Sequence, residues 1–559
     1  MSASRPAAVT RGVRGLLLPL WVVVLALVVL GPVLAPGYAL SYDMVWVPDL
    51  SVTRADTWGL GSSIPRAVPS DAAVAVLGVI VPQQLLQKLL LLGALVAAGL
   101  GGAALTRSLG SPAQWAAATI LVWNPFVAER LAIGHWPLLL AYAATPWLVL
   151  AVRDRRFGVG TLLLAVTALS PASGVMGVVV ALVVGRTRDA WRWALLALAV
   201  NAPWILASLA SPASLRSDAA GVDVFAARGT ESTPVWLEVV SLGGVWNADV
   251  RPGSRETVVA TILSVLLVAA AALGMARLWK RGHRLARPLV ALWVIGFVVA
   301  LVGAVAPGLL SALVETIPGV GLVRDGSRWV VLMAPATALG LAGCVELLAS
   351  RRASVVAAWL VALVLPIALV PDLGWGVGGQ VRAVEYPAAW AEIDEALTDQ
   401  SAPGDLLSLP FSPFRAPEWN RQRPVLDPAG RYFDRVTVTD DTLTVGDVDI
   451  AGEDPRAARV GRALETGDWD AMGAAGVGFV VFDTSAFGAS QVADRVAELP
   501  LVASSGTLEL RRVPALAESQ DDRVRTAVVV AGWLVAAVTL AGVIVQSVRR
   551  RRSATVAGR

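Results

Sequence analysis

The stretch LLLPLWVVVLALVVLGPVL, residues 16–34, is almost wholly apolar and has the length of a helix that crosses a bilayer. Arg5, Arg11 and Arg14 precede it, as basic residues precede the apolar core of a signal peptide. The run is longer than a usual signal core, and Gly37-Tyr38-Ala39 is a weak cleavage signal. We therefore interpret it as a retained first transmembrane span.

The composition of the whole chain agrees with that interpretation. Of its 559 residues, 56% are hydrophobic and 16% are charged, whereas a soluble protein carries about 25% charged residues. The 46 Lys and Arg barely exceed the 42 Asp and Glu, so the charge gives no reason to expect a nucleic acid partner. The sequence predicts a mainly α, polytopic helical membrane protein whose immediate partners include membrane lipids.

The basic loops set the predicted topology, because loops rich in Arg and Lys stay on the cytoplasmic side. An even number of crossings must separate successive basic loops. The runs that satisfy this rule are 15–37, 82–106, 113–127, 136–152, 157–170, 173–186, 191–209, 257–276, 288–306, 329–349, 354–371 and 524–547. They predict about twelve spans in the plasma (inner) membrane, with both termini cytoplasmic.

Two of these runs are short. Residues 157–170 and 173–186 are separated by Ser170-Pro171, and a single helix here would place every later basic loop outside. We therefore expect a hairpin of short helices. The run 113–127 is also short, and we expect its helix to extend into the polar residues that follow.

The sequence divides into three parts. Residues 1–371 form a transmembrane module, residues 372–522 an extracytoplasmic domain of soluble composition, and residues 523–559 a final span with a basic cytoplasmic tail. In the middle part, Leu406–Leu409 and Val477–Phe482 are short apolar runs punctuated by Gly, Pro and Asp, and Pro387–Leu397 has helical character. These features predict an exported α/β domain.

Asp43 and Asp49 follow the first span, in the predicted outer loop. Two carboxylates at this place suit a general base or a divalent cation, and the sequence does not decide whether such a cation takes part. The alternative is an ordinary solvated loop.

A second polar cluster runs from Trp123 to Trp136 and contains Glu129, Arg130 and His135. On the outer face these side chains suit proton transfer or phosphate binding, since the pKa of His lies near neutrality. The alternative is an interfacial turn whose charges pair with other loops.

Three further cations are candidates for binding a phosphate. Arg324 and Arg328 precede the tenth predicted span, and Lys88 lies near the start of the second. For the two Arg residues the alternative is a solvated Asp-Gly turn, and for Lys88 it is snorkelling to the interface. The sequence contains no Walker loop, zinc-ligand spacing or nucleophile elbow.

With its outer acidic residue, its many spans and its C-terminal exported domain, the chain resembles the GT-C glycosyltransferases. The segments Asn124-Pro125-Phe126, Glu129-Arg130, Gly134-His135-Trp136 and Arg324-Asp325-Gly326-Ser327-Arg328 are similar to those of the actinobacterial α-(1→3)-arabinofuranosyltransferases. Those enzymes are much longer and carry carbohydrate-binding modules that this sequence lacks.

The resemblance implies a membrane glycosyltransferase that moves a sugar, in that family arabinofuranose, from a polyprenyl-phosphate donor to a cell-envelope glycan acceptor. It implies that Asp43 is the catalytic base, with Asp49 as the second choice. Glu129, Arg130, His135, Arg324, Arg328 and Lys88 are then substrate-binding candidates. The competing class is a non-enzymatic transporter or assembly protein for envelope lipids or glycans.

Overall fold

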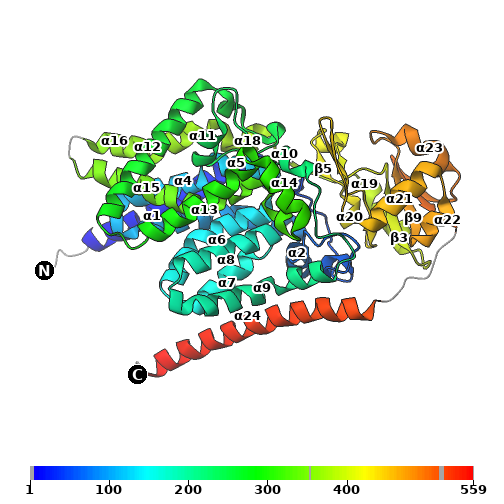
Figure 1. Cartoon of the computed structure of the whole chain (residues 1–559), viewed down its shortest axis with the longest axis horizontal. Coiled ribbons are helices and arrows are strands. Elements are labelled where there is room, and N and C mark those ends of the chain that lie inside the picture. Colours follow the sequence, from blue (N-terminus) through cyan, green and yellow to red (C-terminus); the bar gives the residue numbers. More distant parts are fainter. Residues whose placement is uncertain (1–5, 352–353, 515–521, 558–559) are drawn as a thin grey trace.

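The computed structural model describes residues 6–351, 354–514 and 522–557. Apolar helices form a bundle, and a smaller region built on a β-sheet follows it towards the C-terminus (Figure 1). Seven described helices are long and apolar enough to cross a membrane. They are α1 (Pro6–Leu30), α3 (Gln83–Leu105), α6 (Trp136–Arg153), α9 (Ala190–Ala210), α12 (Val258–Lys280), α13 (Ala286–Val305) and α24 (Arg523–Ala557).

Two further predicted spans are bent. The 3-10 helix η8 (Gly326–Leu332) meets α15 (Ala334–Ala349) at 49°, and Val355–Leu369 meets Pro371–Gly379 at 67°. Counting each bent pair as one span brings the total to nine among the described residues. The protein is therefore a helical membrane protein by the length and composition of its helices, but twelve crossings are not confirmed.

The other three predicted spans are short helices. They are α4 (Ser111–Val122), α7 (Phe157–Thr167) and α8 (Pro171–Val184), of 12, 11 and 14 residues. A straight crossing needs about 17 residues. The expectation of two short helices between 157 and 186 is confirmed, and Pro171 occupies the first turn of the second, where its missing N–H costs nothing.

The expectation that the helix at 113–127 continues into the polar cluster is wrong. Helix α4 ends at Val122, because Trp123 and Asn124 adopt extended conformations. Asn124 instead begins a new helix, α5 (Pro125–Ala132), and its side chain accepts a hydrogen bond from the Val127 amide at 3.1 Å. This capping bond, with Pro125 in the first turn, turns the chain at the point where the polar residues start.

The C-terminal region has a five-stranded mixed sheet in the order β10-β11-β9-β3-β6. Strands β3 (Asp405–Leu409), β6 (Thr437–Val438) and β9 (Val477–Asp483) are parallel, and β10 (Leu501–Ser505) and β11 (Leu508–Arg512) extend the sheet antiparallel. Helix α19 (Ala388–Thr398) packs on one face. Helices α21 (Pro455–Thr466), α22 (Trp469–Ala474) and α23 (Ala489–Ala497) pack on the other.

Main-chain bonds connect the first loop of the bundle to the C-terminal region. Strand β1 (Tyr38–Ala39) pairs antiparallel with β2 (Ala383–Val384). Tyr42 then exchanges backbone hydrogen bonds with Pro424 and Leu426, at 2.6 and 2.8 Å. The segment that carries Asp43 is thus bonded to a part of the chain about 380 residues away.

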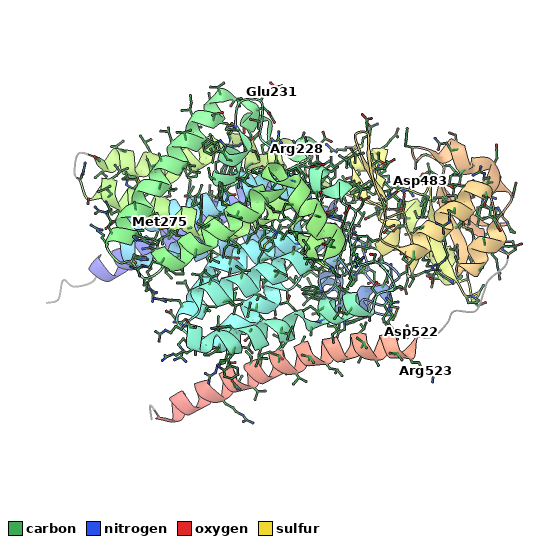
Figure 2. The ribbon with its side chains drawn as sticks, in the orientation of Figure 1. Arg228, Glu231, Met275, Asp483, Asp522 and Arg523 are labelled. Carbon is green, nitrogen blue, oxygen red and sulfur yellow. The ribbon has the colours of Figure 1, made fainter. Side chains whose placement is uncertain are left out.

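The ends of the bundle are distinct. The first turn of α1 and the last turn of α24 lie at one end, and the C-terminal region lies at the other (Figure 1). Helix α24 starts at Arg523, beside Asp522 near the C-terminal region, and packs along α9 (Figure 2).

Candidate functional site

Asp43 and His135, predicted from separate parts of the sequence, are hydrogen-bonded to each other. His135 Nε2 lies 2.9 Å from Asp43 Oδ2. The Asp43 amide also donates to the Ile133 carbonyl at 3.1 Å, which fixes the backbone of the loop against the end of α5. The His135 side chain is 9% exposed and the Asp43 side chain is 45% exposed, so a solvent-accessible carboxylate is hydrogen-bonded to a buried imidazole.

Arg130 determines which nitrogen of His135 carries the proton. Its Nη1 lies 3.0 Å from His135 Nδ1, and a guanidinium can only donate hydrogen bonds. Nδ1 is therefore the acceptor. At Nε2 the Asp43 carboxylate is the closer partner, at 2.9 Å, and Arg328 Nη2, which can also only donate, lies further away at 3.4 Å. The shorter contacts place the proton of the neutral ring on Nε2, where it is donated to Asp43. The result is a directed chain of hydrogen bonds from Arg130 through His135 to the Asp43 carboxylate.

The turn before the tenth predicted span completes the network. Arg130 donates through Nη2 to Ser327 Oγ at 2.5 Å, and Ser327 donates to Asp325 Oδ1 at 2.7 Å. The other Asp325 oxygen accepts from Arg328 Nε at 2.7 Å and lies 3.7 Å from Arg130 Nη1. Asp325 thus holds two guanidinium groups, of which Arg130 is fully buried and Arg328 is 35% exposed.

The charges of this network follow from their surroundings. Partial burial raises the pKa of Asp43, but the hydrogen bond from His135 and the charge of Arg328 lower it below its usual value. Burial and the charge of Arg328 lower the pKa of His135. Burial also opposes ionisation of Asp325, yet Arg328 and Arg130 lower its pKa to about 2. At neutral pH the site therefore has anionic Asp43 and Asp325 and a neutral His135.

A cationic region continues outward from this network. Arg324 lies over the Phe225 ring, 5.0 Å from its centroid, and its Nη1 is 4.0 Å from Glu453 Oε1 of the C-terminal region. Arg66 pairs with the same carboxylate while its own side chain stays 59% exposed, and its charge also lowers the pKa of Asp43. Asp43 is thus the exposed anion among several cations.

Glu129 does not join Asp43, although it precedes Arg130 in sequence. Its Oε1 accepts from the Gly244 amide at 3.1 Å, on a different side of α5. There it neighbours the buried pair Glu238–Arg255, whose charged atoms are 2.9 Å apart. Burial is the largest cause that raises the pKa of Glu129 to about 7, so this side chain belongs to a second, buried cluster.

The remaining two candidates also lie apart from the network. Asp49 is exposed and is close enough to Asp394 of the C-terminal region to raise the pKa of that residue. Lys88 is on α3, beside Gln87, whose amide bonds both backbone groups of Ala39 at 2.8 and 2.9 Å. Of the predicted residues, Asp43, Arg130, His135 and Arg328 therefore converge on one site.

Sequence reasoning missed several residues that build this site. Asp325 and Ser327 were within the predicted turn, and only their neighbours were singled out as binding candidates. Arg423 was missed entirely: its guanidinium donates to Ser41 Oγ and to the Ala132 carbonyl, both at 2.9 Å, and so holds the Asp43 loop to the end of α5. No local pattern around residue 423 marks it.

Within the described residues, no group of three or more His, Cys, Asp or Glu side chains is arranged to hold a metal ion. Comparison with known proteins adds no relationship to this geometry: no family model matches the chain, and no curated protein matches it.

Proposed function

We propose that this protein is a GT-C-type membrane glycosyltransferase that transfers a sugar from a polyprenyl-phosphate donor to a cell-envelope glycan acceptor at the outer face of the plasma membrane. The observation that carries the proposal is that an accessible carboxylate, Asp43, and an accessible guanidinium, Arg328, belong to the same buried hydrogen-bond network. By resemblance to the arabinofuranosyltransferases, arabinofuranose is the first sugar to test.

In the proposed reaction, Asp43 accepts the proton of the acceptor hydroxyl as that oxygen bonds to the anomeric carbon of the donor sugar. The bond from that carbon to the phosphate oxygen breaks, and polyprenyl phosphate leaves with the electron pair. Arg328, with Arg324 and Arg66 further out, stabilises the charge that develops on the phosphate. His135 is a positioning residue: its Nε2–H holds the Asp43 carboxylate in one orientation.

The polarity of the molecule supports the placement. The first turn of α1 and the last turn of α24 are at one end of the bundle, and the C-terminal region and the Asp43 loop are at the other (Figure 1). If the basic termini are cytoplasmic, as the sequence predicts, the proposed position of the site and of the C-terminal domain is outside. A reporter fused after Asp372 is then expected to be extracytoplasmic, and a cytoplasmic signal would overturn this topology.

Substitution of Asp43 tests the chemistry. Membranes containing Asp43→Asn, supplied with a polyprenyl-phosphate sugar and an oligosaccharide acceptor, should lose transfer by about 100-fold or more, since general base catalysis contributes roughly 10²–10⁴-fold. Asp49→Asn is the matched comparison, an exposed carboxylate of the same loop that lies away from His135, and should retain transfer. Unchanged transfer in Asp43→Asn would refute the catalytic role and favour a transporter or assembly protein.

A further inference from the structure

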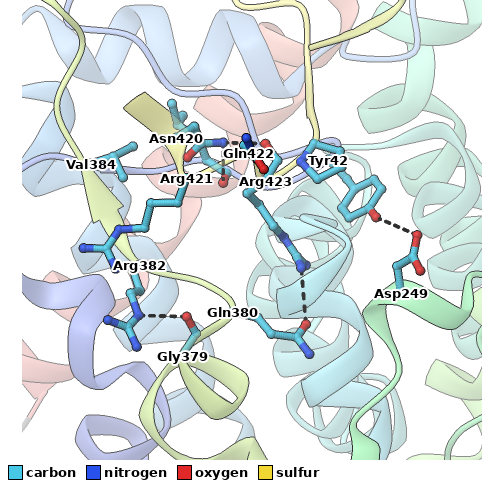
Figure 3. Close-up of a pocket in the computed structure, with 12 residues that line it drawn as sticks. Tyr42, Asp249, Gly379, Gln380, Arg382, Val384, Asn420, Arg421, Gln422 and Arg423 are labelled. Carbon is cyan, nitrogen blue, oxygen red and sulfur yellow. Dashed lines mark hydrogen bonds between the residues drawn. The ribbon is translucent and has the colours of Figure 1, made fainter. Parts of the chain in front are cut away.

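A second site lies on the other side of the Asp43 loop. A cavity of about 390 Å³ opens where this loop, the segment after α18 (Gly374–Gly379) and the turn before β5 (Val425–Leu426) meet (Figure 3). Its polar lining includes Tyr42, Asp249, Gln380, Arg382, Arg421 and Arg423. Asp43, His135 and Arg328 do not line it, so it is separate from the candidate active site.

The lining carries an excess of positive charge. Three guanidinium groups face one carboxylate, that of Asp249, which accepts a hydrogen bond from the Tyr42 hydroxyl at 3.4 Å. Arg382 and Arg421 are drawn on one side of the cavity, and Arg423 extends on the other side towards Gln380, whose Oε1 lies 3.4 Å from Arg423 Nη1 (Figure 3). Counted by residue type, three Arg and one Asp give the lining a formal net charge of about +2.

The hydrogen bonds of these arginines leave that charge uncompensated in the described structure. Arg423 bonds only neutral oxygens, those of Ser41, Ala132 and Gln380. Arg382 donates Nε to the Gly379 carbonyl at 2.8 Å, a neutral acceptor. Neither Arg382 nor Arg421 forms an ion pair among the described residues. Both residues are exposed, so solvent now hydrates their charges, and an oxyanion in the cavity would take the place of that solvent.

The backbone that presents these side chains is held in an unusual conformation. Arg421 and Gln422 have φ values of 55° and 56°, in the left-handed region that non-glycine residues rarely adopt. Their amides donate to the carbonyls of Glu418 and Pro417 at 2.8 and 3.0 Å, which fixes the turn.

The segment that leads into Gly379, a lining residue, has the same feature. Trp375 and Val377, just before Gly379, have φ values of 61° and 54°. A β-branched residue in this region is a true outlier. Strained backbone that the surrounding structure maintains is concentrated at binding sites, because there it orients side chains for a ligand.

We propose that this cavity binds a phosphate-class oxyanion, held by the Arg382 and Arg421 guanidinium groups. The planar guanidinium of arginine can donate two parallel hydrogen bonds to two oxygens of one phosphate. A phosphate dianion also balances the net charge of the lining, whereas a single carboxylate would leave half of that positive charge without a counterion. The cavity is larger than a bare phosphate, so the natural ligand carries the phosphate on a glycan or on a lipid headgroup. This inference stands whether or not the protein transfers sugars.

Binding to the full-length protein tests the proposal. Wild type, Arg382→Gln/Arg421→Gln and the control Arg459→Gln/Arg462→Gln are placed in phosphatidylcholine nanodiscs. The control removes the same charge from exposed arginines of α21. One arm titrates inorganic phosphate against chloride at constant ionic strength by calorimetry. A second arm replaces part of the phosphatidylcholine with phosphatidic acid and reads thermal unfolding by tryptophan fluorescence.

We expect saturable phosphate binding in wild type and in the control, and binding at least tenfold weaker in the Arg382/Arg421 variant, since a hydrogen bond to a charged group is worth about tenfold or more. Stabilisation by phosphatidic acid without binding of inorganic phosphate identifies a lipid headgroup as the source. Arg421→Lys keeps the charge without the fork and should weaken binding severalfold, which covers the case of a misfolded double variant. Binding equal in all variants, or no saturable effect in either arm, overturns the proposal. Because sugar transfer is not measured, this result is independent of the Asp43 test.

Discussion

Replacement of Arg130 tests the buried network most directly. Its guanidinium is fully buried and lies 3.7 Å from an Asp325 oxygen. At an effective dielectric constant of about 20, two unit charges at this separation attract by about 4.5 kcal/mol. Arg130→Met fills similar volume but leaves the Asp325 carboxylate with Arg328 alone and His135 Nδ1 without its donor. We expect it to destabilise the fold by about 3–5 kcal/mol, the range for breaking a buried pair.

The double variant Arg130→Met/Asp325→Leu provides the decisive comparison. With both charges removed, no uncompensated buried charge remains between them, so the double variant should cost at least about 2 kcal/mol less than the two single variants together. Equilibrium unfolding in micelles with increasing SDS, followed by tryptophan fluorescence, measures all three. Arg284 and Asp154 form an exposed pair 3.1 Å apart and serve as the control, for which a coupling below about 1 kcal/mol is expected. Additive costs for Arg130 and Asp325, within about 0.5 kcal/mol, would refute the coupling of the two residues.

Three further predictions concern the same region. Burial raises the pKa of Glu129 from 4.5 to about 7, so the folded protein loses stability as the pH rises from 4.5 to 7 and this carboxyl ionises. Glu129→Gln should therefore be more stable than wild type by up to about 3 kcal/mol at pH 8 and equally stable near pH 4.5, as measured by the same SDS titration. The pKa of Asp325 is lowered from 3.8 to about 2, so its ionised form adds about 2 kcal/mol to the free energy of unfolding above pH 4, and this stabilisation is lost as the pH falls towards 2. In acid unfolding, Asp325→Asn should not show this pH-dependent loss of stability. Gly134 has φ +84°, and a Cβ there would overlap the Ser41 carbonyl oxygen, so Gly134→Ala should lower the free energy of unfolding by more than about 2 kcal/mol. Gly110 has a similar φ of +89° but open space around it, so Gly110→Ala should lower it by about 1 kcal/mol. Thermal unfolding compares the two variants, and equal losses of stability would contradict the packing argument.

The membrane helices could be predicted because their signal is local. A run such as Leu16–Leu34 has both the composition and the length that a bilayer selects, and α1 with the 3-10 turn after it covers that run. The error at 113–127 has an equally local cause. Hydropathy continues through Trp123, whereas the hydrogen bond of the Asn124 side chain to the Val127 amide stops one helix and starts another.

The site was predictable only in part, because its polar residues come from distant segments. Asp43, His135 and Arg328 each stand out as polar residues at the predicted outer surface, and the structure brings them together. Arg324 carries the same sequence signal as Arg328, yet it packs on Phe225, since its contact depends on the tertiary fold. Arg423 contacts Ser41 across 382 positions, and nothing in its local sequence encodes that distance.

The charges around Asp43 bear on how it serves as a base in the proposed reaction. Cations that lower the pKa of Asp43 make the free carboxylate a weak base, which at first opposes its proposed role. The donor carries a phosphate, however, and Arg328 is a partly exposed cation near Asp43, with its Nη2 3.4 Å from His135 Nε2. A phosphate bound to Arg328 neutralises the charge that lowers the pKa and adds a negative charge near the carboxylate, and both effects raise the pKa of Asp43. In the proposed mechanism the donor therefore strengthens the base when it binds, and the carboxylate stays ionised but weakly basic while the site is free. His135 suits this arrangement, because a neutral ring that donates from Nε2 holds the carboxylate in place without adding a second fixed positive charge.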